Sequence, residues 1–309
     1  MKLQHLRTFV AVYEEATFTA AAARENATQS GLSMQIKELE QSLGSSLFVR
    51  SRSGVEPTAA GKRLYAHAVD ILKSVSAARR DVEALSGTVS GQIKVGLMPT
   101  FTRAVLGPTL KAFAADFPEV TVGVAEAYSA VLLRDVARGA LDFAVVPSGQ
   151  LEPGLNARHL ASDMELFVTG ASAGLPHLQP VALTSLKGLK LVLPGPENAR
   201  RAKIDTYINA YGLDVAAIME LDTMFGTLEL VANSDWSTIA PAILCYPDLD
   251  GKTRALHPIT EPAMPLDYLL VSSSTRALSQ VAGLFADELT RQTDRMIADC
   301  HRRLRAGGA

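Results

Sequence analysis

The sequence predicts an all-α winged helix-turn-helix and a long linker helix at the N-terminus, followed by a larger α/β domain. Three observations predict this organisation. Apolar residues recur at helical spacing through residues 3–43, and a short β-prone segment with a turn follows at 47–58. One long apolar stripe then runs through residues 64–85. Beyond Gly91, strand-like and helix-like segments alternate along the chain.

Three amphipathic helices are predicted before residue 44. The apolar face of the first consists of Leu3, Leu6, Phe9, Val10 and Tyr13. Thr17 or Thr19 offers an N-cap for the second helix, which contains the helix-forming run at residues 20–23. Residues 27–31 are typical of a break and restart, and Gly44 ends the third helix. The inward face of this third helix consists of Leu32, Ile36, Leu39 and Leu43.

A small β wing and a long helix follow. Residues 47–50 form the first predicted strand, 51–54 the turn and 55–58 the returning strand. From residue 59 onward, apolar residues recur mostly three or four positions apart, until the glycine-containing segment 87–91 ends the pattern. A stripe of this length, with polar residues between, indicates a helix that pairs with a second copy of itself.

The rest of the chain has the pattern of an α/β domain. Strands are predicted at residues 93–97, 120–125, 143–146, 166–170, 189–193 and 266–272, with helical patterns between several of them. A last helix is predicted from about residue 277 to residue 303. Alternating strands and helices imply largely parallel sheets.

Composition and charge place the chain among globular proteins. Hydrophobic residues make up 48% and charged residues 20% of its 309 residues, enough for two or three domains. No apolar run reaches the roughly 18 residues of a membrane span, and the first residues lack a secretory signal pattern. We therefore expect a cytoplasmic protein with no membrane partner. Residues 1–86 carry 11 Lys/Arg against 9 Asp/Glu, and the remainder 19 against 23, which favours nucleic-acid binding only weakly.

The residues that usually carry catalysis or metal binding do not occur in characteristic patterns. Cys245 and Cys300 are too few for a disulfide framework and lack the spacing of a zinc site, so reduced thiols are expected. There is no serine elbow with an ordered triad, no glycine-rich phosphate loop and no metal spacing among the six histidines. We expect no enzymatic activity, no metal and no cofactor. A transport receptor is a further alternative, against which the missing signal peptide argues.

A DNA-reading surface is predicted on the third helix and the wing. A helix-turn-helix inserts its second helix into the major groove, where small polar and basic side chains contact bases and phosphates. The outward positions of this helix are Thr28, Gln29, Ser30, Ser33, Met34 and Lys37. The wing adds Arg50, Arg52 and Ser53. The alternative for each element is an ordinary solvated helix face or loop.

Residues 3–61 resemble the N-terminal domain of LysR-type transcriptional regulators. The residues that match the pattern of this family are Phe18, Ala21, Ala22, Gln29, Ser33, Ile36, Leu39, Glu40, Leu43, Gly44, Leu47, Phe48, Arg50, Thr58 and Gly61. Glu25 and Pro57 depart from it, because the family usually has leucine at both positions. The resemblance implies a transcriptional regulator that binds half-sites in double-stranded promoter DNA as a homodimer or homotetramer, with RNA polymerase as a further partner.

The resemblance also implies a domain organisation. Residues 1–58 would form the DNA-binding domain, 59–90 the linker and dimerisation helix, and 91–309 an effector-binding domain. This last domain would have two lobes, like a periplasmic binding protein, with a small molecule in the cleft between them. From the predicted strands, lobe I comprises 91–163 and 266–309, and lobe II comprises 164–265.

The effector site is predicted where strands end and helices begin. The candidate residues are Thr100, Phe101, Thr102, Tyr128, Ser129, Pro147, Thr169, Pro194, Asn198, Arg200, Arg201, Phe225 and Trp236. Two arginines in the first turn of a helix oppose its dipole, which indicates a nearby anion and favours an aromatic or aliphatic carboxylate as effector. The alternatives are that both arginines face solvent and that Trp236 belongs to the core.

Cysteine-based redox sensing is the alternative function within the same family. Its peroxide-sensing members use a pair of cysteines in the regulatory domain. Here Cys245 belongs to the predicted lobe II and Cys300 to the last helix, 55 residues further along the chain. The sequence therefore favours a small-molecule effector over a thiol switch.

Overall fold

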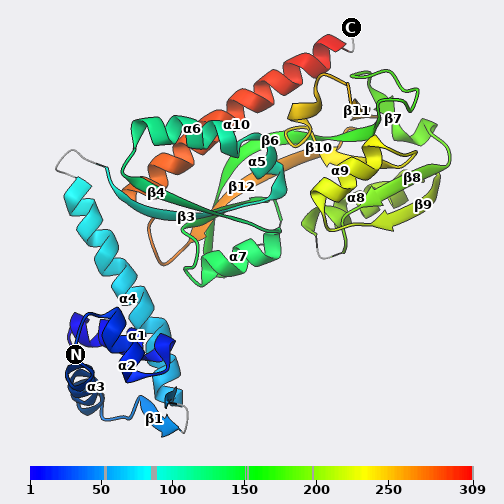
Figure 1. Cartoon of the computed structure of the whole chain (residues 1–309). Helices are drawn as coiled ribbons and strands as arrows, with labels where there is room; N and C mark the ends of the chain where they lie inside the picture. The colour runs from blue at the N-terminus through cyan, green and yellow to red at the C-terminus, as the bar shows by residue number, and fades with distance from the viewer. Residues whose placement is uncertain (52–53, 85–88, 150, 152, 197, 308–309) are drawn as a thin grey trace. The chain divides into compact units, whose positions relative to one another are not determined.

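The computed structural model describes residues 1–51, 54–84, 89–149, 151, 153–196 and 198–307. The chain divides into two compact units, Met1–Thr88 and Val89–Ala309 (Figure 1). The buried apolar residues of each unit form separate core clusters. Within the described ranges, no helix combines the length and apolar character that crossing a membrane requires.

The first unit consists of three short helices, a β-hairpin and a long helix. α1 (Leu3–Glu15), α2 (Phe18–Arg24) and α3 (Gln29–Leu43) precede the antiparallel strands β1 (Phe48–Ser51) and β2 (Gly54–Pro57), and α4 (Ala59–Ala84) follows. The inward face of α3 is confirmed, since Leu32, Ile36 and Leu39 are at most 3% exposed. Leu3 and Leu43 were predicted to be inward-facing and are instead exposed, because each lies at a helix end.

Residues that flank α2 and α3 cap the ends of these helices. The Thr17 side chain accepts a hydrogen bond from the backbone N–H of Ala20, so Thr17 and not Thr19 is the N-cap of α2. Thr28 caps α3 by accepting from the Gly31 N–H at 3.2 Å. Gly44 ends α3 with a φ of 63°, a left-handed conformation that glycine adopts without steric cost.

The hairpin is attached to α3 by polar contacts. A Glu40 carboxylate oxygen accepts from the backbone N–H groups of Leu47 at 2.7 Å and Phe48 at 3.3 Å. On the other side, Thr58 donates to the Ser46 carbonyl at 2.7 Å and caps α4 by accepting from Gly61. A Cβ atom at Gly61 would lie 2.2 Å from the Leu47 carbonyl oxygen, so only glycine fits there. These contacts fix the wing relative to the helix that precedes it.

The first turns of α4 pack against α1. The rings of Tyr13 and Tyr65 stack with centroids 4.0 Å apart. The Tyr65 hydroxyl donates to Glu14 at 2.6 Å, and Glu14 also pairs with Arg24 at 2.6 Å. The bond to Glu14, together with burial, raises the pKa of Tyr65 to about 12. The start of the long helix is thereby fixed to the helix-turn-helix.

The second unit contains one continuous sheet built from two parallel groups of strands. β4 (Val120–Glu126), β3 (Gly91–Leu97) and β5 (Phe143–Pro147) form the first group, and β10 (Ser237–Pro241), β8 (Leu189–Leu193) and β9 (Val215–Glu220) the second. β12 (Pro265–Ser273) and β6 (Leu155–Gly170) lie between them and pair antiparallel. The predicted parallel sheets are present in each group, whereas the antiparallel centre was not predicted.

The long strand β6 belongs to both halves of the sheet. Its residues 155–164 pair with β12, and residues 165–170 pair with β10 and β11 (Arg254–Thr260). The short strand β7 (Val181–Ala182) pairs with β11. Lobe I consists of β3, β4, β5, β12 and the first part of β6. Lobe II consists of β8 to β11 and the last part of β6.

Helices cover both lobes. α5 (Pro99–Ala104), α6 (Leu106–Asp116) and α7 (Ser129–Ala137) belong to lobe I, and α8 (Ala199–Ala210) and α9 (Met224–Ala232) to lobe II, with short 3-10 turns at Leu183–Ser185 and Tyr246–Asp248. α10 (Gln280–Gly307) begins three residues and ends four residues later than predicted.

The last helix, α10, packs against both lobes. Its residue Phe285 lies in the core of lobe I, but Cys300 and Leu304 join the core around Leu166 and Val231 in lobe II. The end of this helix therefore packs against lobe II, although the predicted lobe I includes residues 266–309.

Candidate functional site

The outward face of α3 presents the polar and basic side chains that the sequence predicts for reading DNA. Thr28, Gln29, Ser30, Ser33, Met34 and Lys37 are all exposed. Met34 is 64% exposed, although an apolar side chain of this size is usually covered. Behind this face, Gln35 accepts a hydrogen bond from Thr8 at 2.5 Å and so fixes α3 against α1.

The predicted wing residues are described only in part. Arg50 lies in β1, where the structure describes its backbone alone. Arg52 and Ser53 lie outside the described residues. Their contact with DNA stays a prediction.

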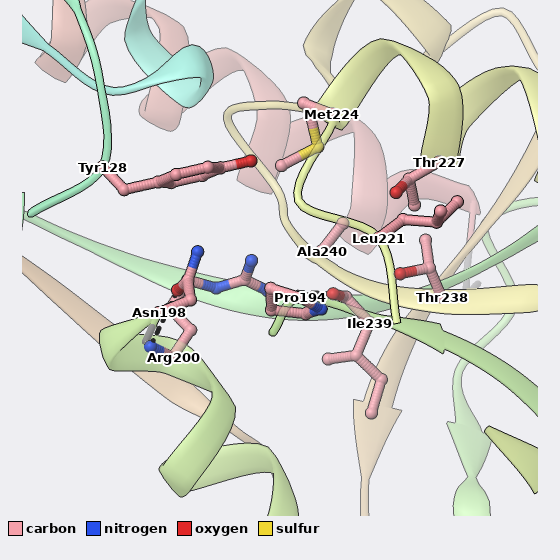
Figure 2. A pocket seen from close by; sticks show the side chains of 10 residues that line it. All are labelled: Tyr128, Pro194, Asn198, Arg200, Leu221, Met224, Thr227, Thr238, Ile239 and Ala240. Carbon is pink, nitrogen blue, oxygen red and sulfur yellow. Dashed lines mark hydrogen bonds between the residues drawn. The ribbon is translucent and has the colours of Figure 1, made fainter. Parts of the chain in front are cut away.

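A pocket lies between the lobes of the second unit, where the second parallel group of strands ends. It is partly open to solvent. Its lining residues are Tyr128, Pro194, Asn198, Arg200, Leu221, Met224, Thr227, Thr238, Ile239 and Ala240 (Figure 2). Tyr128 is the residue that lobe I contributes, and its hydroxyl donates to the Asp222 carbonyl of lobe II at 2.9 Å. The pocket therefore includes a direct hydrogen bond between the lobes.

A second pocket adjoins the first and shares Tyr128 and Met224 with it. It is more open to solvent than the first, and its lining residues are Pro99, Glu126, Ala127, Tyr128, Asp222, Thr223, Met224 and Phe225. Burial, followed by the negative charges of Asp222 and Glu126, raises the pKa of Tyr128. We refer to the two pockets together as the cleft.

Arg200 is the buried cation of the cleft. It is 6% exposed, and its Nε and Nη2 each donate to one Glu165 carboxylate oxygen at 2.7 Å. Nη2 also donates to the Ile239 carbonyl at 2.8 Å. Burial opposes the charge of the guanidinium, but the Glu165 carboxylate outweighs this and raises the pKa of Arg200. Among the residues that the structure describes, Nη1 has no hydrogen-bond partner.

The neighbouring Arg201 does not line the cleft. Its side chain pairs with Asp205 at 2.8 Å, with Glu220 at 2.8 Å and with the Pro194 carbonyl at 2.8 Å. Of the two arginines that the sequence left as alternatives, Arg200 faces the cleft, and the alternative that both face solvent is wrong.

Five of the thirteen predicted effector residues line the cleft. They are Tyr128, Pro194, Asn198, Arg200 and Phe225. Neither pocket includes Thr100, Phe101, Thr102, Ser129, Pro147, Thr169, Arg201 or Trp236.

The structure gives a physical reason for several of these exclusions. Phe101 is fully buried, edge-on to Tyr268, with centroids 4.8 Å apart, and Thr100 and Pro147 are buried as well. Thr169 is buried with its hydroxyl 3.3 Å from the His257 ring nitrogen. Thr102 donates to Glu126, and Ser129 donates to the Met98 sulfur at 3.6 Å. Trp236 is partly buried. None of these side chains lines the cleft, although Thr102 bonds to Glu126, which does.

Sequence reasoning missed the acidic and apolar lining that follows β4 and β9. Glu126 is the last residue of β4, and residues 221–224 follow β9 directly, just before the predicted Phe225. The rule that ligands bind where parallel strands end would have selected both segments. The pattern of residues 215–220 does not predict a strand, so from the sequence alone this rule does not point to the segment that follows them.

Two family models match the chain. The LysR substrate binding domain matches residues 86–294, and the bacterial regulatory helix-turn-helix protein, lysR family, matches residues 3–62. The chain belongs to the LysR family of transcriptional regulators. As a LysR-type regulator, it has a helix-turn-helix DNA-binding domain and an effector-binding domain. The family consists of regulators and not enzymes, in agreement with the sequence-based prediction.

Individual relatives extend over most of the chain. The nitrogen assimilation regulatory protein nac of Klebsiella aerogenes is 29% identical over 283 residues, or 91% of this chain and 92% of its own length. The HTH-type transcriptional regulator IlvR of Caulobacter vibrioides is 30% identical over 250 residues, or 79% and 83%. A mutant of Corynebacterium glutamicum OxyR has a similar fold, with a TM-score of 0.66 at 22% identity over 97% and 95% of the two chains.

The two cysteines of this LysR-type regulator are buried in one core cluster. Cys245 and Cys300 are both reduced, and the Cys300 thiol donates to the Ala242 carbonyl at 3.7 Å. Burial raises the pKa of Cys300 to about 12 and that of Cys245 further still. Since the thiolate is the reactive form, neither thiol is activated for oxidation in this conformation. In the part of the chain that the structure describes, no group of three or more His, Cys, Asp or Glu could hold a metal ion.

Proposed function

We propose that this regulator senses an organic carboxylate in the cleft of its effector domain and transmits binding to promoter DNA. The observation that carries the proposal is Arg200, a buried arginine that lines the cleft with Nη1 lacking a protein partner in the described structure. The Glu165 pair holds the guanidinium in place before a ligand arrives. A preorganised N–H donor on a cation forms strong hydrogen bonds to carboxylates.

The polar neighbours of Arg200 are suited to the same ligand. Asn198 and Thr227 line the pocket beside it, and Thr238 donates its own hydroxyl proton to the Val192 carbonyl. Leu221, Met224 and Ile239 supply an apolar wall for the body of the molecule. Small-molecule sites commonly combine an apolar wall with a few fixed polar groups of this kind.

The proposed mechanism couples the lobes to the DNA-binding domain. Tyr128 and Asp222 already connect the lobes across the cleft, and a ligand bound beside them would stabilise one arrangement of the lobes over another. A ligand shifts such an equilibrium only as far as its affinities for the two arrangements differ. Within a homodimer or homotetramer, residues 59–90 would carry the change to residues 1–58. These DNA-binding domains would then move on their spaced half-sites in double-stranded DNA. RNA polymerase would be the further partner at the promoter.

We favour a carboxylate effector over cysteine-based redox sensing because of the buried thiols. Their raised pKa values disfavour the thiolate that an oxidant attacks. A Cys245→Ser variant should therefore retain its response to the effector. Loss of the DNA response in this variant would favour the redox alternative.

The carboxylate is tested by thermal unfolding of the full chain with aromatic and aliphatic acids, such as benzoate and succinate. An acid at about 100 times its dissociation constant should stabilise the protein by about 2.7 kcal/mol. We expect the shift to disappear in Arg200→Lys, which keeps a cation beside Glu165 but loses the planar guanidinium. Arg201→Lys on the same helix is the control and should keep the shift, because Arg201 lies outside the cleft. If neither these simple acids nor amino acids, which also carry a carboxylate, shift the melting temperature, the effector is not a carboxylate.

The DNA-reading face is tested by substitutions on α3. Gln29→Ala should weaken binding by about 1–3 kcal/mol and relax specificity at one base pair, since glutamine can bond adenine through two hydrogen bonds. Lys37→Ala should lower the slope of log affinity against log salt by about 1, as expected for one lost phosphate contact. Fluorescence anisotropy on a DNA fragment selected from a random pool measures both.

The matched control is a substitution of the exposed Lys111 in α6, because it removes the same charge far from α3 in the sequence. Lys111→Ala should leave affinity and salt slope unchanged. Wild-type binding by both α3 variants would remove these residues from the DNA contact, while leaving the family assignment intact.

A further inference from the structure

The part of the cleft beyond Arg200 is acidic. The second pocket has two carboxylates among its eight lining residues, Glu126 and Asp222, and no Lys, Arg or His. It is continuous with the pocket that holds Arg200, because Tyr128 and Met224 line both. In Figure 2, Tyr128 and Met224 lie across the pocket from Arg200. A ligand that reaches from one pocket to the other therefore contacts opposite charges at its two ends.

Both carboxylates are fixed by a single contact and keep an oxygen for a ligand. Glu126 accepts from the Thr102 hydroxyl through Oε2, and Asp222 accepts from the Gly195 backbone N–H through Oδ1 at 2.9 Å. A Cβ atom at Gly195 would lie 2.6 Å from Asp222 Oδ2, so the glycine allows this carboxylate to approach closely. In the described structure neither carboxylate forms an ion pair.

The charges of the cleft do not balance without a ligand. Glu165 already compensates Arg200 through two hydrogen bonds within the protein. Glu126 and Asp222 then leave an excess of negative charge. A ligand with a carboxylate alone adds to this excess, whereas one that also carries an ammonium group reduces it.

Aromatic side chains next to the two carboxylates favour the same cation. Tyr128 lines both pockets, and Phe225 lines the second with 65% of its surface exposed. A cation close to an aromatic face is attracted by the negative potential of the ring.

We propose that the effector is an amino-carboxylate, whose ammonium group lies between Glu126 and Asp222 while its carboxylate accepts from Nη1 of Arg200. This inference rests on the proposed function, since it assigns the second half of the same ligand. Arg200, which is 6% exposed, lines the first pocket and has no protein partner for Nη1 in the described structure, fixes the anionic end. The two carboxylates fix the cationic end, and the apolar wall between them contacts the side chain.

The test is a thermal-shift panel of α-, β- and γ-amino acids on the full chain. Each amino acid is compared with its analogue lacking the amine and its analogue lacking the carboxylate, for example leucine with 4-methylpentanoate and 3-methylbutylamine. We expect at least one amino acid to raise the melting temperature and both of its analogues to have little effect. The matched analogues separate the contribution of each charged end.

Charge-neutral variants test the cationic end directly. Glu126→Gln and Asp222→Asn should each weaken the amino acid at least about tenfold in isothermal titration, since the ammonium then meets a neutral amide oxygen in place of a carboxylate. Neither should weaken the analogue without the amine, because each variant removes a negative charge that repels its carboxylate. Glu119→Gln, just before the other end of β4, removes the same charge outside the cleft and should have no effect.

The outcomes distinguish the two proposals. If the analogue without the amine binds as tightly as the amino acid, or if both variants bind as the wild type does, the ammonium site is wrong and the carboxylate effector stands. If neither acids nor amino acids shift the melting temperature, both proposals fail. A shift by the amine alone, kept in Arg200→Lys, would also overturn the carboxylate end.

Discussion

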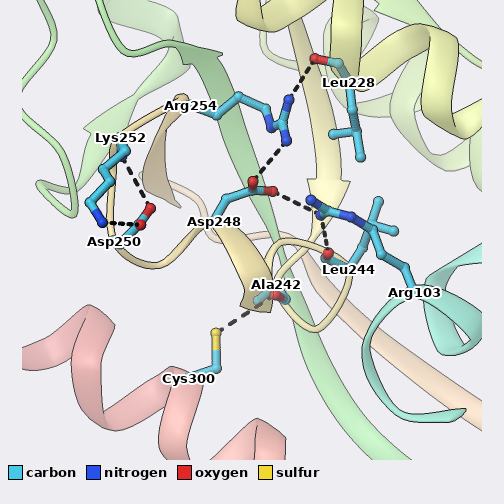
Figure 3. A network of polar contacts seen from close by, with 9 residues as sticks. All are labelled: Arg103, Leu228, Ala242, Leu244, Asp248, Asp250, Lys252, Arg254 and Cys300. Carbon is cyan, nitrogen blue, oxygen red and sulfur yellow. Dashed lines mark hydrogen bonds and ion pairs between the residues drawn. The ribbon is translucent and has the colours of Figure 1, made fainter. Parts of the chain in front are cut away.

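Asp248→Ala is expected to lower the free energy of unfolding of the effector domain by about 3–5 kcal/mol. Asp248 is 6% exposed and accepts from Arg103 Nη1 and Arg254 Nη2, each at 2.8 Å (Figure 3). Burial opposes the charge of Asp248, but the two arginines outweigh it and lower the pKa of this carboxyl. Removing the carboxylate leaves two largely buried guanidinium groups without their shared counter-ion.

The same network connects the two lobes. Arg103 belongs to α5 and also donates to the Leu244 carbonyl at 2.6 Å. Arg254 begins β11 and donates to the Leu228 carbonyl of α9 at 2.9 Å. Asp248 thus joins a helix of lobe I to a helix of lobe II, so its loss should weaken the contact between the lobes as well as the fold of each.

Chemical denaturation followed by fluorescence measures this effect. Trp236 is the only tryptophan of the chain and lies just before β10, so its emission reports on lobe II. Asp250→Ala is the matched control, because Asp250 is an exposed aspartate two residues further on that pairs with Lys252 at 3.3 Å. The control should leave the midpoint unchanged. An equally small change for Asp248→Ala would show that the buried network does not stabilise the domain.

Local sequence signals predicted the N-terminal domain better than the cleft. The caps at Thr17 and Thr28 and the inward face of α3 depend on residues close in sequence, and such patterns can be found without tertiary contacts. Tyr128, Pro194 and Asn198 were found because they follow strands with a clear apolar pattern. Helix starts after such strands are sites where ligands commonly bind.

The remaining cleft residues depend on contacts between distant segments. β9 alternates between partly buried and exposed residues at the edge of the sheet, with Ile218 45% exposed, so it lacks the apolar run of a central strand. Because this strand was not predicted, Asp222, which follows it, was not predicted as a cleft residue. The pair between Arg200 and Glu165 joins a helix start to a strand 35 residues earlier, and no local pattern predicts which charges will meet across such a distance.

Lowering the pH from about 7 to about 4 is expected to destabilise the effector domain through His257. This residue of β11 is 1% exposed, lies 6.1 Å from the Phe167 ring between centroids, and has its Nε2 3.3 Å from the Thr169 hydroxyl. Burial, helped by the nearby His177, lowers the pKa of His257 from 6.5 to about 4. The folded protein therefore keeps this imidazole neutral at pH values where the unfolded chain protonates it.

The direction of the effect follows from proton binding. Below about pH 6.5 the unfolded chain takes up a proton that the folded chain does not bind until about pH 4, so stability decreases as the pH falls through this window. A difference of this size in pKa corresponds to about 3 kcal/mol at the acidic end. Urea midpoints of wild type and His257→Gln between pH 7.5 and pH 4.5 measure it, with the exposed His159→Gln as control. The His257 variant should lose most of the pH dependence of the urea midpoint that the control retains, because glutamine is not protonated in this range. Parallel curves for all three proteins would place the acid sensitivity in other groups.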